Sequence, residues 1–231
     1  MFELQYVPLA LPFFLLFVGL FIFLVILIQL HVLHFAYAKL GLSSGAALLV
    51  LLASLIGSYF NIPIAELPER EVRSGEVIEF FSMRYVVPLV TDWTRTVIAI
   101  NIGGAVIPSL LSLYLLIKND ILGSAAIATA VVMVACYLLA QPVPGVGIAI
   151  PSLVPPIIAA TTALLVAQRN VAAVAYVSGS LGTLIGADLL NLGKIQGLGA
   201  PVMSIGGAGT FDGIFLTGIL AVLLASFSPR A

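Results

Sequence analysis

The sequence is poor in charge, in cysteine and in histidine, and these shortages exclude several classes of protein. Only 8% of its 231 residues are charged, and nine Lys and Arg residues stand against ten Asp and Glu residues. This balance lacks the basic surface that nucleic acid requires, so we expect no nucleic-acid partner. The single cysteine, Cys136, has no partner for an intramolecular disulfide, and we expect it to be a small packing residue.

Apolar residues, by contrast, make up 61% of the chain, and the mean hydropathy is +1.22. A soluble domain of this length has too little interior to bury that much apolar surface. The charge-free run from Leu4 to Ala38 is longer than the apolar part of a signal peptide, and no basic residue precedes it. We therefore expect a multi-pass integral protein of the cell membrane, anchored in the lipid bilayer from its first span.

Seven apolar runs approach the length of about 20 residues that a membrane-spanning helix requires. They are Leu9 to Leu33, Gly41 to Phe60, Thr96 to Ile117, Ile121 to Ala140, Val146 to Ala167, Val171 to Leu192 and about Ile205 to Phe227. The predicted fold class is therefore an all-α membrane protein with about seven transmembrane helices. "QPVPG" at 141–145 predicts a hairpin between the fourth and fifth spans, and the prolines of the fifth predict a kinked or partly unwound helix.

A polar segment from Asn61 to Arg95 separates the second span from the third. Its runs "IPIAELP" and "EVIEFFSMRY" are strand-like and flank "EREVRSG". The segment is either a β-hairpin outside the membrane or an amphipathic loop on the membrane surface. We thus expect three parts: two N-terminal helices in 1–60, the extramembrane segment in 61–95, and a five-helix core in 96–231.

The basic residues of the loops predict an orientation. With seven spans, one side carries Lys39, Lys118, Arg169 and Arg230, and the other carries Lys194 and the arginines of the polar segment. Short cytoplasmic loops are enriched in Lys and Arg, so we expect the N-terminus outside the cell and the C-terminus inside.

Two aspartates, Asp188 and Asp212, lie within apolar stretches, where an ionisable side chain usually marks a functional site. Asp212 opens the seventh span, where the helix dipole and an N-cap at Thr210 are an alternative explanation. Asp188 lies near the end of the sixth span, where the dipole disfavours an acid; the alternative is a carboxylate that reaches water at the interface.

Both aspartates lie toward the loop that joins the sixth and seventh spans, because these spans are consecutive and antiparallel. This loop holds six glycines and one proline, a composition suited to a segment that dips into the protein. Two carboxylates within reach of each other share a proton, and such a pair can activate water for attack on an amide. We therefore take Asp188 and Asp212 as candidate catalytic residues.

The segment "GTFDGIFLTGILAVLL" resembles the second catalytic motif of the presenilin and signal peptide peptidase superfamily, in which Gly-x-Gly-Asp opens an apolar helix. Gly209 and Asp212 match its first and last positions, while Phe211 replaces its second glycine. "GAD" at 186–188 stands where that superfamily has an aromatic-Asp pair. The resemblance implies an aspartic intramembrane peptidase with transmembrane or hydrophobic peptide substrates. The chain as a whole also resembles an uncharacterised family of archaeal and bacterial multi-spanning proteins.

Other polar and small residues favour simpler interpretations. His31 and His34 share a helix face, but a metal site would need further ligands from elsewhere, so we expect no metal and no cofactor. Asn101 either lines a polar cavity or binds a neighbouring helix. Gly179, Gly182 and Gly186 form a stripe that predicts close helix packing.

Three functions remain open from the sequence. The first is an aspartic intramembrane hydrolase that uses Asp188 and Asp212. The second is a proton- or ion-coupled transporter or channel, because intramembrane carboxylates and broken helices also build ion sites. The third is a membrane scaffold without catalytic activity, in which the 61–95 segment engages a partner.

Overall fold

The computed structural model describes residues 18–23, 26, 38–68, 77–80, 83–86, 95–143, 147–194, 202–207 and 213–226. Three of its helical segments are long and apolar enough to cross a membrane, namely Ile102–Asn119, Leu122–Leu139 and Val171–Lys194. They indicate a membrane protein. Seven transmembrane helices remain a prediction, because the other apolar helices are shorter and most of the first expected span lies outside the described residues.

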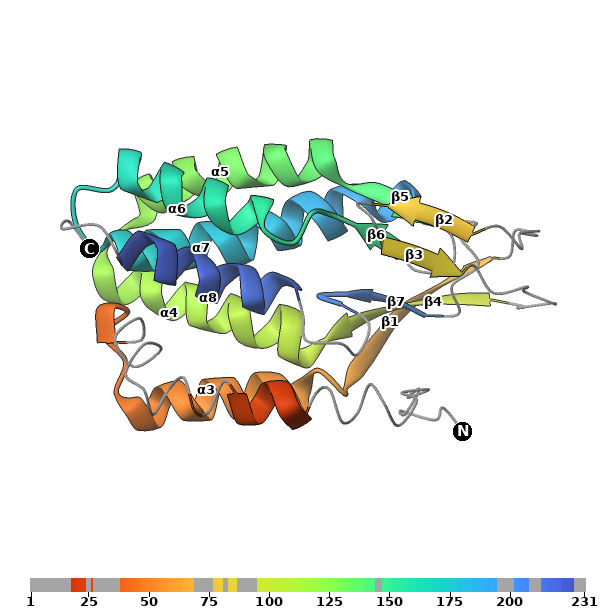
Figure 1. The fold of residues 1–231 in the computed structure, drawn as a ribbon, viewed down its shortest axis with the longest axis horizontal. Coiled ribbons are helices and arrows are strands. Elements are labelled where there is room, and N and C mark those ends of the chain that lie inside the picture. Colours follow the sequence, from red (N-terminus) through yellow and green to blue (C-terminus); the bar gives the residue numbers. More distant parts are fainter. Residues whose placement is uncertain are drawn as a thin grey trace.

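The main helices run side by side along the long axis of the molecule (Figure 1). They are α3 (Ser44–Gly57), α4 (Ile107–Asn119), α5 (Leu122–Leu139), α6 (Val154–Val166), α7 (Val171–Thr183) and α8 (Gly213–Ser226). Helix α7 is the central one, since it packs against α4, α5, α6 and α8 and nearly all of its residues are buried. Its many alanines, glycines and serines let the neighbouring helices approach closely.

The glycine stripe of the central helix packs as its spacing predicts. A Cβ atom on Gly182 would lie 2.6 Å from Cβ of Val132 on α5, and one on Gly186 would lie 2.9 Å from Cβ of Cys136. Gly179 instead touches α6 and α8, at 3.4 Å from Cβ of Ala159 and of Ala221. The stripe therefore serves close packing against three neighbours.

Small sheets at one end of the helix bundle correct the expectation of an all-α protein. Strand β4 (Arg95–Asn101) lies between β1 (Asn61–Pro68), which is antiparallel to it, and β7 (Val202–Ile205), which is parallel. Strands β2 (Val77–Phe80) and β3 (Met83–Val86) form a separate hairpin. The two strand-like runs of the polar segment are thus strands, but they do not pair as one hairpin, because β1 takes β4 as its partner.

Three expected spans begin later than the sequence predicts, because each expected start is extended chain. The third was expected from Thr96, but β4 occupies 95–101; its β-branched residues suit a strand once β1 is beside them. The seventh was expected from Ile205, which instead ends β7. The fifth was expected from Val146, but residues 147–149 form a strand and α6 begins only at Val154. Prolines occupy the first turn of α6, where proline starts a helix and does not kink it.

The hairpin predicted from "QPVPG" is confirmed. Strand β5 (Gln141–Val143) pairs with the antiparallel strand β6 (Gly147–Ala149), and residues 144–146 between them lie outside the described part of the chain. The predicted fourth span is confirmed as well, since α5 covers Leu122–Leu139.

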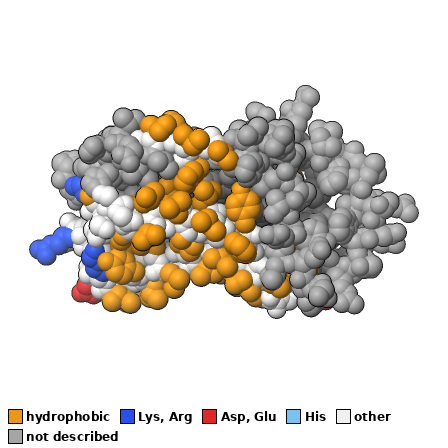
Figure 2. Space-filling model, turned by 90° about the horizontal axis from the view of Figure 1, so that it is seen from below, with side chains coloured by type: hydrophobic (Ala, Val, Ile, Leu, Met, Phe, Trp, Pro, Cys, Tyr) orange, Lys and Arg blue, Asp and Glu red, His pale blue; other side chains and the backbone are white. Residues whose placement is uncertain are grey.

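Apolar side chains cover the outer faces of the helices, as a bilayer requires. Leu49 and Ile56 on α3, Leu110 and Ile117 on α4, and Leu138 on α5 are all more than half exposed. Figure 2 shows such an apolar surface, with charged side chains gathered at one end. Apolar side chains of this kind can face lipid tails, because neither forms hydrogen bonds.

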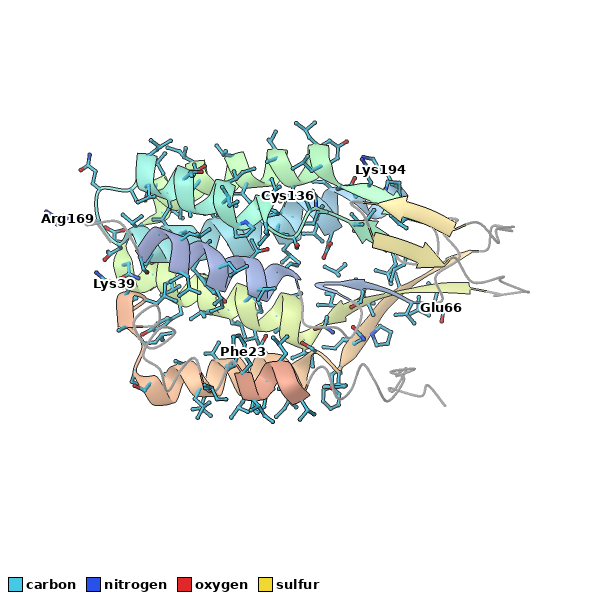
Figure 3. The ribbon with its side chains drawn as sticks, viewed as in Figure 1. Phe23, Lys39, Glu66, Cys136, Arg169 and Lys194 are labelled. Carbon is cyan, nitrogen blue, oxygen red and sulfur yellow. The ribbon has the colours of Figure 1, made fainter. Side chains whose placement is uncertain are left out.

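Charged residues lie at the two ends of the bundle. Lys39 and Arg169 are at the end away from the sheets, whereas Glu66 and Lys194 lie at the sheet end (Figure 3). Lys118 joins the first group, because its Nζ donates a 2.6 Å hydrogen bond to the carbonyl of Gly41. The grouping of Lys39, Lys118 and Arg169 opposite Lys194 is therefore the one that the sequence predicts.

Candidate functional site

Asp188 lies where the central helix changes its winding. The α-helical part of the helix ends at Thr183, a π-helical turn (η2) covers Leu184–Asp188, and a 3₁₀ turn (η3) covers Leu189–Lys194. A π turn is uncommon and is often found at functional sites. Asp188 is the last residue of this turn, and its side chain is half-buried on the sheet side of the bundle.

The carboxylate of Asp188 is held by the main chain of a distant segment. The backbone N–H of Gly206, just after β7, donates a 2.7 Å hydrogen bond to Oδ2 of Asp188. A charge-assisted bond of this kind is stronger than one between neutral groups. One carboxylate oxygen is therefore oriented by the main chain, and Oδ1 has no hydrogen-bond partner among the residues that the structure describes.

Gly206 cannot readily be another residue. Its φ is +93°, a backbone conformation that side-chain-bearing residues rarely adopt. A Cβ atom would also lie 2.6 Å from the nitrogen and 2.7 Å from Cβ of Ala105. The missing side chain thus allows the chain after β7 to pass between Ala105 on one side and Asp188 on the other.

Ala105 belongs to a second π turn, which begins where strand β4 ends. This turn, η1, covers Ile102–Val106 and leads directly into α4. Its N-cap is Asn101, whose Oδ1 accepts a 2.8 Å hydrogen bond from the nitrogen of Gly104. Of the two alternatives for Asn101, the structure shows the bond to a neighbouring helix, because its Nδ2 donates to the carbonyl of Ser58 at the C-terminal cap of α3. Asn101 also caps η1, and the two irregular helical turns meet at Gly206.

Asn191 fixes the turn that carries Asp188. It is fully buried, and its Nδ2 donates to the carbonyls of Gly186 and Ala187, at 2.8 and 3.0 Å. These are the two residues immediately before Asp188. Its Oδ1 is buried without a hydrogen-bond partner in the described part of the chain, which is unusual for a buried polar atom.

Cys136 behaves as the small packing residue that the sequence predicts. It is 1% exposed, and its sulfur lies 3.6 Å from Oγ1 of Thr183, the residue immediately before η2. Figure 3 shows it within the helix bundle. The pair occupies the α5–α7 contact, and we assign it a packing role.

Asp212 lies outside the described residues, so the structure gives no distance between it and Asp188. His31 and His34 also lie outside the described residues. Helix α8 begins at the next residue, Gly213. Ile214 packs in one buried apolar cluster with Leu184, the first residue of η2. Within the described ranges, no group of three or more His, Cys, Asp or Glu residues could hold a metal ion.

Several residues around Asp188 have no strong signal in the sequence. Gly206 is one of many loop glycines, and Asn191 merely lies two residues before Gly193, where a helix is expected to stop. What singles them out is their contacts with Asp188 and its turn. Those contacts depend on residues far apart in the chain, so no local pattern reveals them.

A model of the family described as "Protein of unknown function (DUF1614)" matches residues 55–224, which include both aspartates and helices α4 to α7. Searches of curated proteins and of solved structures gave no match. The expected resemblance to an uncharacterised family is thus confirmed, whereas nothing in these comparisons supports the resemblance to presenilin and signal peptide peptidase. Because the match covers most of the sequence, the chain belongs to the DUF1614 family.

Proposed function

We propose that the protein is a membrane-embedded hydrolase of the aspartic type, with Asp188 and Asp212 as its two acids. Its substrates would be transmembrane or otherwise hydrophobic peptide segments. One carboxylate takes a proton from water, whose oxygen attacks the amide carbon, and the other acid protonates the departing nitrogen. The proposal includes seven membrane spans, with the N-terminus outside the cell.

The packing at the start of α8 is the observation that carries this proposal. Ile214 and Leu184 share one buried cluster, and they lie two residues after Asp212 and four residues before Asp188, respectively. Helices α7 and α8 pack closely along their length (Figure 1). Such packing favours a short distance between the two acids, which a catalytic dyad requires.

The environment of Asp188 also favours hydrolysis. The N–H of Gly206 orients one oxygen of the carboxylate, while the other has no partner among the described residues and can exchange a proton with water. Asp188 is half-buried and lies six residues before the end of its helical segment at the sheet end. Water is a reactant in hydrolysis, and this position is closer to water than the middle of a bilayer.

Cleavage by the purified full-length chain in liposomes tests the proposal. A transmembrane peptide with a fluorescent group and a quencher on either side of its scissile region reports the rate. We expect Asp188→Asn and Asp212→Asn each to lower kcat by about a hundredfold or more, the usual contribution of an acid–base group. Their thermal unfolding should stay close to that of the wild type.

The matched control is Asp120→Asn, which removes the same charge elsewhere. Asp120 is exposed and has a φ of 49°, a conformation that asparagine tolerates well. This variant should cleave at the wild-type rate. Full cleavage by either of the other aspartate variants, or no cleavage by the wild type across a panel of transmembrane peptides, would overturn the proposal.

A proton- or cation-coupled transporter is the second candidate, because of the two π turns. Helical breaks that meet at one point also build ion sites in transporters. Here η1 and η2 both approach Gly206, beside Asp188. Ion flux into liposomes that is lost in Asp188→Asn, together with no peptide cleavage by the wild type, would select this function instead.

A further inference from the structure

We infer that the side chains of Asn61, Asn101 and Ser204 position the carboxylate of Asp188 by holding strand β7 in place. This inference rests on the proposed function of Asp188. It assigns the three residues a positioning role, since they act through β7 and Gly206 and not on a substrate.

Asn101 is the centre of this network. It is 1% exposed, and its Nδ2 donates to the carbonyl of Ser58 at 2.8 Å and to Oδ1 of Asn61 at 3.1 Å. Its Oδ1 accepts from Gly104 in the π turn η1. One buried amide therefore joins the end of α3, the start of β1 and the π turn η1 that precedes α4.

Asn61 extends the network across the sheet to β7. Its Oδ1 also accepts a 2.5 Å hydrogen bond from Oγ of Ser204, a residue 143 positions later. In the ladder, Asn61 is opposite Asn101 and Ser204 is opposite Ala99. Side chains two apart on a strand share a face, so the polar groups of all three strands meet over the small side chain of Ala99.

Strand β7 transmits this constraint to the site. Ser204 precedes Gly206 by two residues, and the pairing of β7 with β4 continues to Ile205. Gly206 then donates to Oδ2 of Asp188 and lies against Ala105 of η1. Asn101 caps η1 and, through Asn61, also binds β7, so the network sets the position of Gly206 from two directions.

The direction of the hydrogen bond to Asp188 follows from the position of Gly206. A catalytic group must be held within about 0.5 Å of its productive position, and a shift of about 1 Å can cost a hundredfold in rate. A strand of four residues at the edge of a sheet has few ladder bonds of its own. The link from Ser204 to Asn61 therefore restrains a segment whose position matters for the rate.

Ser204→Ala in the full-length chain tests the inference, because it removes one hydroxyl and leaves the ladder intact. We expect kcat for peptide cleavage to fall about tenfold while KM stays unchanged, as for a lost orientation effect. Hydrogen–deuterium exchange at the Gly206 amide should become faster, since its bond to Asp188 opens more often. Ser204→Thr keeps a hydroxyl and should restore both values.

The control is Ser226→Ala, which removes a buried hydroxyl that donates to the carbonyl of Val222, near the end of α8. It should change neither kcat nor the exchange at Gly206. Wild-type kcat and exchange in Ser204→Ala, or the same defect in Ser204→Thr, would overturn the inference. If the wild type cleaves no peptide, the proposed hydrolase fails, and exchange at Gly206 alone then decides whether Ser204 positions this segment.

Discussion

Gly206 donates its backbone N–H to Oδ2 of Asp188 over 2.7 Å, although the two residues are 18 positions apart. The bond joins the π turn η2 of the central helical segment to the residue that follows strand β7. Because its donor is a main-chain group, the bond depends on the path of the backbone. Residues that set this path therefore also determine how the aspartate is held.

Gly206→Ala should destabilise the protein. The substitution forces a side chain onto a residue with φ +93° and brings its Cβ to 2.6 Å from the nitrogen of Ala105. Backbone strain costs about 1 to 3 kcal/mol, and overpacking costs a similar amount. We expect a loss of at least about 2 kcal/mol in the free energy of unfolding, measured by denaturant titration in detergent.

Gly123→Ala is the matched control for that substitution. Gly123 lies in α5, and a Cβ atom there would have nothing within 4 Å. Alanine should raise stability by about 0.5 to 1 kcal/mol, because it restricts the unfolded chain and favours the helix. Equal stability of the two variants would contradict the assigned role of Gly206.

Asn191→Leu should loosen the turn that carries Asp188. The variant keeps a similar volume but loses the hydrogen bonds to the carbonyls of Gly186 and Ala187. We expect a loss of about 1 to 3 kcal/mol and faster amide exchange in 184–194. Asn119→Leu is the control, since Asn119 makes one 3.1 Å bond to Leu115 in a part-buried position; it should cost less than about 1 kcal/mol.

Gly103→Ala should separate α3 from the π turn η1. Gly103 packs against Ser54 and Ser58 of the α3 segment, and its carbonyl accepts a hydrogen bond from Oγ of Ser54. A Cβ atom would overlap the backbone of both serines. We expect a loss of about 1 to 3 kcal/mol in thermal or denaturant unfolding.

Gly45→Ala provides the comparison for Gly103. Gly45 is in the first turn of α3, and a Cβ atom there would have nothing within 4 Å. Its replacement by alanine should leave the unfolding midpoint equal to or above that of the wild type. A midpoint for Gly103→Ala within error of the wild type would show that the α3–η1 contact tolerates a side chain.

Cysteine labelling should test the orientation in the membrane. In a Cys136→Ala background, Arg169→Cys and Lys194→Cys place one thiol at an exposed position at each end of the bundle. We expect a membrane-impermeant reagent to label position 194 in intact cells and position 169 only after lysis, because basic short loops face the cytoplasm. Labelling of both from the same side would contradict the proposed topology.

The span that contains helix α5 could be predicted from the sequence almost to the residue. The prediction of Ile121 to Ala140 as a span agrees with α5 at Leu122–Leu139, since the run has no charge and no proline. The hairpin around "QPVPG" could also be predicted, because proline and glycine act on their immediate neighbours. These signals are local, and tertiary contacts do not change them.

The strands next to the site could be recognised only in part. An apolar, β-branched run such as Thr96 to Ile100 suits a buried helix or a strand, and its neighbours in space decide between them. Strand β4 forms because β1 and β7 are on either side of it, and β7 comes from a segment about 100 residues later. The local sequence pattern does not identify these partners.

By itself, the sequence determined that this is an apolar, mostly helical membrane protein with an aspartate at position 188 inside an apolar stretch. Hydrophobicity and helical length are sums over adjacent residues, so they can be read from the chain directly. Only the tertiary structure decided what holds that acid: a main-chain N–H at Gly206, an amide at Asn191 and two π turns. A hydrogen bond forms only within a range of a few tenths of an ångström in the donor–acceptor distance, and packing between remote segments sets that distance.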